Sequence, residues 1–360
     1  MYQYNNIKSL HLELSDKCNA SCPQCARNQS GGKVNPQLPL VELSLNDIKK
    51  IVPTDLMAQL KSALFCGNYG DPILAKEMVE ILEYFREINP GIHLSINTNG
   101  SARDAAWWAR LGLVIKEQGN VKFGIDGLAD THHLYRKGTD FNKIIRNAEA
   151  FISTGGHAVW EYIVFKHNEH QIEEARALAE KMGFKKFTVK KTGRFFSNSK
   201  LEKKDYQDVL DENNQPTYKI EMPTNPEYHN LSLTKEEDLV NHFGSLQNYL
   251  DKTEVSCKTS NEKSLYISSE GLVFPCCWTA NQMYVWYMPK GSTPVYKMLT
   301  KFGGPSVINA KTSSIKEIIE GPFFKSIKES WSCSSIKEGK LQVCAKTCGN
   351  SFDQFIDQYK

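Results

Sequence analysis

The chain has 360 residues, 40% of them hydrophobic, which is enough for one large domain plus a smaller one or for two ordinary domains. Its 44 Lys and Arg residues against 41 Asp and Glu residues give a net charge of +3, with both signs mixed along the chain, so bulk charge gives no support for a nucleic-acid partner. The sequence has no run near the roughly 18 apolar residues of a membrane-spanning helix and no apolar signal-peptide core at its start, so we expect a cytoplasmic protein without a membrane partner.

Short β-like runs alternate with helix-length segments through the first half of the chain. Apolar or β-branched runs predict six strands, at 10–14, 62–66, 92–97, 121–125, 158–165 and 186–190. The helix-length segments between them include 73–88, 103–117, 141–154 and 169–182. At the start of the last one, Asn168 and Gln171 predict a capping box. This alternation predicts an α/β fold with a parallel sheet and right-handed crossovers, either doubly wound or curled into part of a barrel.

The pattern changes after about residue 192. Residues 193–234 are polar and rich in charges and turn residues, which predicts an extended bridging segment, and a helix-like stretch follows over 235–251. Two β runs around a Ser-Ser-Glu-Gly turn predict a hairpin over 264–278, before a helical pattern over 313–330. We therefore expect three parts: a domain over 1–192, a bridge with a helix over 193–251, and a small hairpin and helix domain over 252–360.

Three of the ten cysteines are crowded together directly after the first predicted strand. In a chain without an export signal, cysteines point to metal ligands or redox groups rather than disulfides. Cys18, Cys22 and Cys25 have the spacing C-x3-C-x2-C. Three thiolates can hold three irons of a [4Fe-4S] cluster and leave the fourth iron open to a ligand. The spacing alone also permits a zinc site with a remote fourth ligand, or three unrelated core cysteines.

Polar segments, most of them with glycine, follow the other predicted strands: "CGNYGDP" (66–72), "NTNG" (97–100), "IDG" (125–127), "KHN" (166–168) and "KKTGR" (190–194). Since the functional loops of a (β/α) barrel gather at the C-terminal ends of its strands, we expect these segments to meet around the cysteines. Taken singly, "GNYGDP" also fits a surface turn and Asp126 a turn-capping residue. His132 and His133 are expected at a solvated helix start.

Over roughly residues 7–192 the sequence resembles the radical S-adenosylmethionine (radical SAM) superfamily. The resemblance rests on "CNASCPQC" as the cluster motif and on "GNYGDP" where the family has a Gly-Gly-Glu-Pro-like motif. It implies a partial (β/α)6 TIM-like barrel, a [4Fe-4S] cluster on Cys18, Cys22 and Cys25, and S-adenosylmethionine on its open iron. The cofactor contacts that it implies come from Gly70, Asp71, Pro72, Asn97, Thr98, Asn99, Asp126 and Arg136. Two positions depart from the family pattern, Gln24 where an aromatic residue is frequent and Gly124 where a serine is frequent.

A second group of cysteines lies in the last third of the chain. Cys257 is followed after thirteen residues by Gly271, and Cys276 comes after four more, which resembles the opening of SPASM/twitch extensions. The C-x3-C pair near the end resembles the close of the same motif, but the C-x2-C-x5-C run of a complete SPASM domain is missing. The resemblance therefore implies one auxiliary [4Fe-4S] cluster, with candidate ligands Cys257, Cys276, Cys333, Cys344 and Cys348. Cys277 is an alternative to its neighbour, and a zinc ribbon-like site is an alternative to the cluster.

The resemblance implies an enzyme of the oxidoreductase or maturase class. Such an enzyme reductively cleaves S-adenosylmethionine to a 5′-deoxyadenosyl radical, using a one-electron donor such as a flavodoxin or ferredoxin, and abstracts hydrogen from a substrate C–H bond. The expected reaction is oxidative modification or cross-linking of a peptide or protein side chain, with oxidation of a small molecule as the alternative. We expect no fused leader-peptide module, because the first strand begins near residue 10. A non-catalytic iron-sulfur carrier and a zinc-stabilised binding protein are alternatives from other classes.

Overall fold

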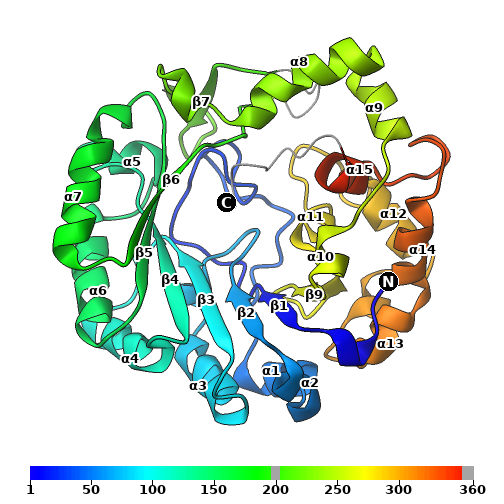
Figure 1. Ribbon diagram of the computed structural model, residues 1–360, viewed down its shortest axis with the longest axis horizontal. Coiled ribbons are helices and arrows are strands. Elements are labelled where there is room, and N and C mark those ends of the chain that lie inside the picture. Colours follow the sequence, from blue (N-terminus) through cyan, green and yellow to red (C-terminus); the bar gives the residue numbers. More distant parts are fainter. Residues whose placement is uncertain (196–202, 351–360) are drawn as a thin grey trace.

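The computed structural model describes residues 1–195 and 203–350. Its main feature is one curved sheet of eight strands in the order β10-β9-β1-β2-β3-β4-β5-β6 (Figure 1). All neighbouring strands are parallel except β9 and β10. The two edge strands, β6 and β10, do not pair with each other in the described part of the chain, so the sheet does not close and the barrel is partial. The strands are β1 Ser9–Leu12, β2 Ser62–Phe65, β3 His93–Thr98, β4 Gly119–Gly124, β5 Ala158–Ile163, β6 Lys186–Lys190, β9 Ser264–Ile267 and β10 Val273–Phe274.

Helices cover the outer face of β1 to β6 (Figure 1). In α6 the buried side chains Ile144, Ala148 and Phe151 recur at helical spacing, and the Asp140 side chain caps the helix by accepting from the backbone N–H of Lys143. The helical elements of this half are η1 Tyr4–Asn6, α1 Leu45–Ile51, α2 Thr54–Gln59, η2 Pro72–Leu74, α3 Met78–Ile88, α4 Ala105–Ile115, α5 His132–Tyr135, α6 Phe141–Ser153, η3 Glu169–Gln171 and α7 Ile172–Met182. The six predicted strands and the helices between them are confirmed.

The two faces of the sheet differ in burial. In β1, Leu10 and Leu12 are fully buried against the helices, whereas Ser9 and His11 are half-buried on the inner face. The same alternation holds in β2, where Ala63 and Phe65 belong to the buried core. Because side chains alternate along a strand, the inner face carries the polar residues and is the face available to ligands.

The predicted C-terminal hairpin is confirmed, and it extends the sheet of the barrel. β9 pairs in parallel with β1, with His11 opposite Tyr266, and β10 returns antiparallel to β9. Leu265 and Phe324 belong to the same hydrophobic core as Leu10. The remaining helical elements are η4 Pro226–Tyr228, α8 Leu231–Phe243, α9 Leu246–Lys252, α10 Lys258–Asn261, α11 Cys277–Ala280, α12 Pro294–Thr300, η5 Pro305–Ile308, α13 Ile315–Glu320, α14 Pro322–Ser330 and α15 Gln342–Cys348. The boundaries at 192 and 251 stay predictions, and residues 351–360 lie outside the described chain.

A second, two-stranded sheet lies in the segment predicted to be extended. β7 (Tyr206–Leu210) and β8 (Pro216–Glu221) form an antiparallel hairpin, and residues 196–202 of the predicted bridge lie outside the described chain. The prediction missed this hairpin because its strands carry only two fully buried apolar residues, Val209 and Ile220, among charges. The hairpin packs on the cysteine loop: Gln207 Nε2 donates to the carbonyl of Pro23 at 2.7 Å.

Three local predictions were wrong. Asn168 and Gln171 form no capping box: Asn168 Oδ1 accepts from the N–H of Phe165 at 2.7 Å, and Gln171 Oε1 accepts from the N–H of Leu128 at 3.0 Å. The helix predicted over 235–251 is two helices separated at Gly244, whose φ of 77° ends α8. The helix predicted over 313–330 is likewise divided at residues 321–322, where Pro322 begins a new helix.

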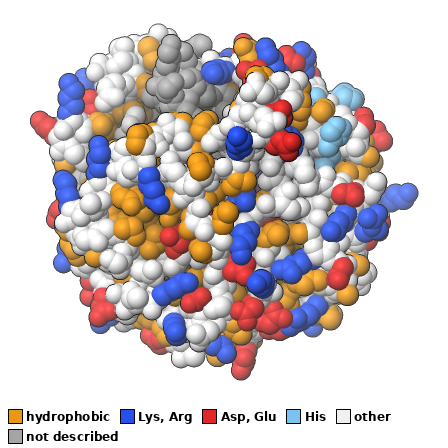
Figure 2. All heavy atoms as spheres, turned by 180° about the vertical axis from the view of Figure 1, so that it is seen from behind, with side chains coloured by type: hydrophobic (Ala, Val, Ile, Leu, Met, Phe, Trp, Pro, Cys, Tyr) orange, Lys and Arg blue, Asp and Glu red, His pale blue; other side chains and the backbone are white. Residues whose placement is uncertain are grey.

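The rear face of the molecule carries charges of both signs, interspersed around groups of hydrophobic side chains (Figure 2). No basic stripe crosses this face in the described chain, which agrees with the near balance of charge in the sequence. None of the described helices has the length and apolar character needed to cross a membrane.

Candidate active site

The first cysteine loop begins six residues after β1 and crosses the centre of the ring of elements (Figure 1). Cys22 is buried, and Cys18 and Cys25 are half-buried. These thiols pack with Val209 and Ile220 of the β7–β8 hairpin in a small apolar cluster. The structure therefore brings the three predicted ligands together in a site with little solvent.

Hydrogen-bond donors point at the sulfurs of this loop. The backbone N–H of Ala20 lies 3.3 Å and the Asn99 side-chain amide 3.6 Å from Cys18 Sγ, and Arg136 Nη1 lies 4.0 Å from Cys22 Sγ. Burial raises the pKa of Cys22 to about 11, so this thiol stays protonated unless it binds a metal. N–H groups around cysteine sulfurs are the usual environment of iron-sulfur ligands, so the residues present fit a cluster.

The loop after β2 is pressed against the cysteine loop. A Cβ on Gly70 would lie 1.8 Å from the carbonyl oxygen of Ser15, so only glycine fits there. The N–H of Asp71 donates to the carbonyl of Lys17, one residue before Cys18, at 2.9 Å. The sequence-predicted Gly70, Asp71 and Pro72 are thus adjacent to the cluster loop, with Pro72 buried at the start of η2.

Polar side chains at the end of β3 join these two loops. Asp71 Oδ2 accepts from the N–H of Asn99 at 2.7 Å, and the Thr98 side chain also hydrogen-bonds this carboxylate, whose pKa is raised by burial. Asn99 Nδ2 donates to Asn19 Oδ1 at 3.0 Å. Asn97 lies beside the thiol of Cys66, and its buried Oδ1 has no hydrogen-bond partner among the described residues. The side chains of Asp71, Thr98 and Asn99 therefore connect the end of β3 to the Gly70 loop and to the cysteine loop.

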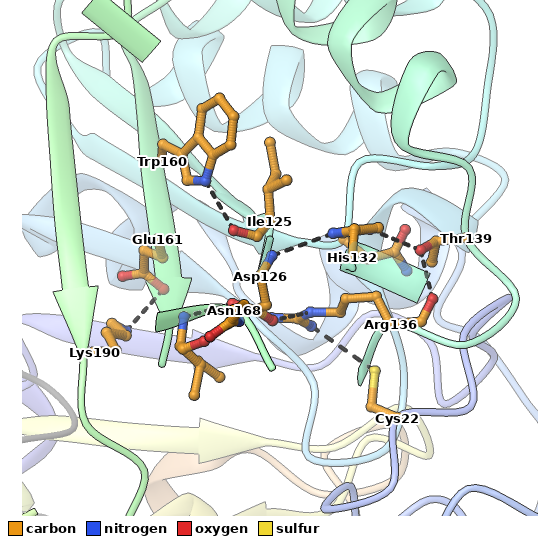
Figure 3. A network of polar contacts seen from close by, with 12 residues as sticks. Cys22, Ile125, Asp126, His132, Arg136, Thr139, Trp160, Glu161, Asn168 and Lys190 are labelled. Carbon is orange, nitrogen blue, oxygen red and sulfur yellow. Dashed lines mark hydrogen bonds and ion pairs between the residues drawn. The ribbon is translucent and has the colours of Figure 1, made fainter. Parts of the chain in front are cut away.

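Arg136 and Asp126 form a buried ion pair beside Cys22 (Figure 3). Arg136 Nε donates to Asp126 Oδ2 at 2.6 Å, and Asp126 Oδ1 accepts from the N–H of Ile163 at 2.6 Å. Burial opposes the charge of Arg136, but attraction by Asp126 raises its pKa well above the ordinary value, so the guanidinium stays cationic. A Cβ on Gly124 would lie 2.4 Å from Arg136 Nη2, so a serine at this position would displace the guanidinium.

His132 is buried next to this pair, so its predicted solvated position was wrong. Its Nδ1 accepts from the N–H of Asp126 at 3.2 Å, and its Nε2 lies 2.9 Å from Thr139 Oγ1 (Figure 3). Burial lowers the pKa of His132 to about 3, which keeps the ring neutral. The four-residue helix α5 turns this ring inward, whereas His133 is exposed as predicted.

Two charged residues on the inner face were missed by the sequence analysis. Glu161 of β5 and Lys190 of β6 form an ion pair, with 2.8 Å between Oε2 and Nζ, and each side chain is about one-seventh exposed (Figure 3). The sequence did contain a signal for this pair, because Glu161 is a charged residue at an inward-facing position of β5, a strand that is otherwise apolar or aromatic. The pair adds fixed charges of both signs to the inner face near Asp126.

The second cysteine group lines one cavity between the hairpin and the last helix. Cys257, Cys276, Cys344 and Cys348 all lie on its wall, together with Thr279 and Trp331. Cys333 is not among the lining residues; its sulfur lies 3.9 Å from the carbonyl of Glu329. The structure thus brings together four of the five predicted ligands.

The four thiols of this cavity also have polar neighbours. Thr259 Oγ1 lies 3.4 Å from Cys257 Sγ, Thr279 Oγ1 lies 3.5 Å from Cys276 Sγ, and the indole of Trp331 faces the thiol of Cys344. A hydrogen bond with Cys348 lowers the pKa of Cys257 to about 6 and raises that of Cys348. Four thiols with hydrogen-bonding neighbours fit a [4Fe-4S] cluster. In residues 1–195 and 203–350, no three His, Cys, Asp or Glu side chains are arranged as ligands of a single metal ion.

Cys277 lies on a different side of this hairpin end. Its thiol is buried near Cys66 and Glu13, and burial raises its pKa well above the ordinary value. Cys276 at the N-cap of α11 and Cys277 at its first position therefore have different surroundings.

Comparison with known proteins agrees with this geometry. Residues 12–179 match the model of the radical SAM superfamily. The chain contains a radical SAM domain. These residues hold the first cysteine loop, the Gly70 loop, Asn99 and the Arg136–Asp126 pair, so the site just described belongs to that domain. No curated protein matches the chain.

Solved structures similar to the chain include SuiB of Streptococcus suis. SuiB bound to its precursor peptide SuiA matches with a TM-score of 0.57 at 14% identity, over 99% of this chain and 77% of that one. SuiB bound to S-adenosylmethionine matches with a TM-score of 0.54 at 14% identity, over 94% of this chain and 72% of that one. Native anSMEcpe with bound AdoMet matches with a TM-score of 0.50 at 19% identity, over 92% of this chain and 88% of that one. At these identities the likeness shows the fold, and it extends beyond the radical SAM domain.

Proposed function

We propose that this chain is a radical SAM enzyme that oxidises or cross-links a peptide or protein side chain, with one auxiliary [4Fe-4S] cluster as electron acceptor. The observation that carries the proposal is the pairing of a radical SAM domain with a separate cavity lined by four cysteines. A carrier of electrons needs neither an open iron nor a loop shaped for a second ligand. The Gly70 loop, which excludes any larger side chain, provides that shape.

The residues of the radical SAM domain have separate roles in this proposal. When bound, the cluster and S-adenosylmethionine would supply the 5′-deoxyadenosyl radical that takes a hydrogen atom from the substrate. Cys18, Cys22 and Cys25 would hold the cluster and leave one iron for the cofactor. Backbone carbonyls of the Gly70 loop would bind the cofactor's amino group, since glycine lets them approach closely. Arg136 would bind its carboxylate with the guanidinium nitrogens that do not contact Asp126.

The auxiliary cavity would hold a closed cluster. Four cysteine ligands leave no iron position for a substrate, so the cluster there can accept or pass electrons and hold the fold together. A net oxidation of the substrate needs such an acceptor for the second electron. A flavodoxin- or ferredoxin-type protein would supply the first electron to the barrel cluster.

A peptide substrate is favoured by the extent of the structural likeness to SuiB, which was solved with a precursor peptide and matches almost the whole chain. The inner face of the sheet is polar and carries charges of both signs at Glu161 and Lys190, so it can bind backbone and side-chain polar groups of a peptide. Oxidation of a small polar molecule is the alternative that the substrate experiment below distinguishes.

The metal and cofactor chemistry can be tested on anaerobically reconstituted protein. We expect two [4Fe-4S] clusters, about eight irons per chain, and slow formation of 5′-deoxyadenosine with a strong reductant. Replacing Cys18, Cys22 and Cys25 together by Ala should remove one cluster and all 5′-deoxyadenosine. Zinc in place of iron would establish the zinc-binding alternative, and clusters without cofactor cleavage would establish the electron carrier.

The substrate class can be tested by mass spectrometry. Candidate peptides encoded beside the gene should lose hydrogen on incubation with the reduced enzyme and S-adenosylmethionine, and should increase the yield of 5′-deoxyadenosine. The triple cysteine variant serves as the control. Stimulation by a co-purified small molecule, with no peptide modified, would replace the peptide proposal by small-molecule oxidation.

A further inference from the structure

The loop that would bind the cofactor is also bonded to the C-terminal part of the chain. Asn68 Nδ2 donates to the carbonyl of Cys277 at 2.8 Å, and the Tyr69 hydroxyl donates to the carbonyl of Asn281 at 3.1 Å. The ring of Tyr69 also packs edge-on against Tyr284, with 5.8 Å between ring centroids. These contacts come from side chains on two neighbouring residues of the loop, directly before Gly70.

Glu13, which follows β1, connects the same loop to the C-terminal hairpin. Its Oε1 accepts from the N–H groups of Tyr69 at 2.7 Å and Gly70 at 3.0 Å. Its Oε2 accepts from the hydroxyl of Tyr266, which lies on β9. The N–H of Glu13 itself donates to the carbonyl of Ile267 at 2.9 Å. Glu13 is 2% exposed, so water does not compete for these bonds.

The loop is packed closely between Glu13 on one side and Ser15, just before the cysteine loop, on the other. A Cβ on Gly67 would lie 2.6 Å from Glu13 Oε1, and Gly70 is in contact with Ser15. A change in the direction of the Glu13 carboxylate therefore moves the backbone of Tyr69 and Gly70. Tyr266 is the side chain from the C-terminal part that fixes this direction.

We propose that Glu13 is a positioning residue for cofactor binding and that Tyr266 orients it, so that the C-terminal hairpin sets the affinity of the radical SAM domain for S-adenosylmethionine. The inference rests on the proposed function, since it concerns the same cofactor loop. Coupling between two sites is reciprocal, so bound S-adenosylmethionine stabilises the hairpin and the start of α11 to the same extent. Cys276, a candidate auxiliary ligand, lies at that start.

The substitution Tyr266→Phe tests the inference because it removes one hydroxyl and keeps the ring. We expect the Kd for S-adenosylmethionine, measured from the change in the electron paramagnetic resonance spectrum of the reduced barrel cluster, to rise about tenfold, the size of one buried hydrogen bond. Asn68→Ala should raise it as well. Glu13→Gln keeps an acceptor oxygen and should bind better than Glu13→Ala.

Tyr162→Phe is the matched control, because the Tyr162 hydroxyl is a buried donor to the carbonyl of Asn168 at 2.7 Å and does not contact the loop. Its Kd should equal that of the wild type. Iron content should be equal in all of these proteins. A hydrogen-exchange measurement adds a second readout: S-adenosylmethionine should slow exchange in residues 264–284 of the wild type, and this slowing should be lost in Tyr266→Phe.

The possible failures are distinguishable. Equal Kd values and equal protection in Tyr266→Phe, Tyr162→Phe and wild type would overturn the inference and leave the proposed function intact. A wild-type protein with both clusters that binds no S-adenosylmethionine would overturn the proposed function and this inference with it.

Discussion

Arg136 donates from Nε to the buried carboxylate of Asp126 at 2.6 Å, and the same guanidinium reaches toward Cys22. Asp126 has no exposed surface, and its other oxygen accepts from the backbone of β5. The pair therefore fixes the end of β4, the end of β5 and the cation beside the cluster loop at once. Its loss should affect both folding and the cofactor site.

Asp126→Ala should lower the free energy of unfolding by about 3–5 kcal/mol, because it leaves a buried cation without its partner. The measurement is anaerobic urea unfolding followed by circular dichroism. The exposed pair Lys166–Glu221 provides the control, since Glu221→Ala should change the same free energy by at most about 1 kcal/mol. Equal effects of the two substitutions would show that the Asp126 pair is not a buried one in solution.

His132 should make the protein less stable in mild acid. A pKa lowered from 6.5 to about 3 means that the folded state disfavours the proton, so the stabilisation is complete above pH 6.5 and is lost as the pH falls below it. The proton would have to occupy Nδ1, which already accepts from the N–H of Asp126. The expected loss between pH 6.5 and 5 is about 2 kcal/mol.

The comparison of His132→Gln with His133→Gln measures this effect. His132→Gln should reduce the acid-dependent loss of unfolding free energy, whereas His133→Gln, at an exposed position, should leave it as in the wild type. If both variants had the acid dependence of the wild type, His132 would not be buried as a neutral acceptor.

The auxiliary cluster should depend on Cys344 and not on Cys333. Cys344 lines the cavity with Cys257, Cys276 and Cys348, whereas Cys333 lies outside it. Cys344→Ala should therefore lose about four irons per chain while Cys333→Ala keeps all of them. Iron and sulfide analysis of the reconstituted proteins is the measurement, and loss of a cluster in Cys333→Ala would assign that residue as a ligand.

Gly70→Ala should damage the cofactor loop. Because the added Cβ would overlap the carbonyl of Ser15, the loop must move, at a cost of about 1–3 kcal/mol, and binding of S-adenosylmethionine should be lost. Gly91→Ala is the control, since its Cβ would contact only Asn89 at 4.0 Å. Calorimetric binding and thermal unfolding report the two effects separately. Normal binding by Gly70→Ala would remove this loop from the cofactor site.

The sequence alone determined the barrel half of the fold and the first cysteine set. Period-two apolar runs and helical spacing are local properties, so they predicted all six strands of the barrel. Cys18, Cys22 and Cys25 are neighbours along the chain, and their site therefore needs only one loop. The polar hairpin β7–β8 escaped prediction because its two buried residues, Val209 and Ile220, pack in a cluster with residues far along the chain, such as Cys22 and Phe165.

Only the tertiary structure decided which distant residues meet. Five cysteines were candidates for the auxiliary site, and spacing does not exclude any of them, whereas packing of α15 against the end of the hairpin brings four to one cavity. Parallel pairing of β9 with β1 places Tyr266 on Glu13, 253 residues apart, and the α5 turn buries His132 against Asp126. These contacts arise from long-range burial of polar groups that must find partners, and such partners are set by the fold and not by local sequence.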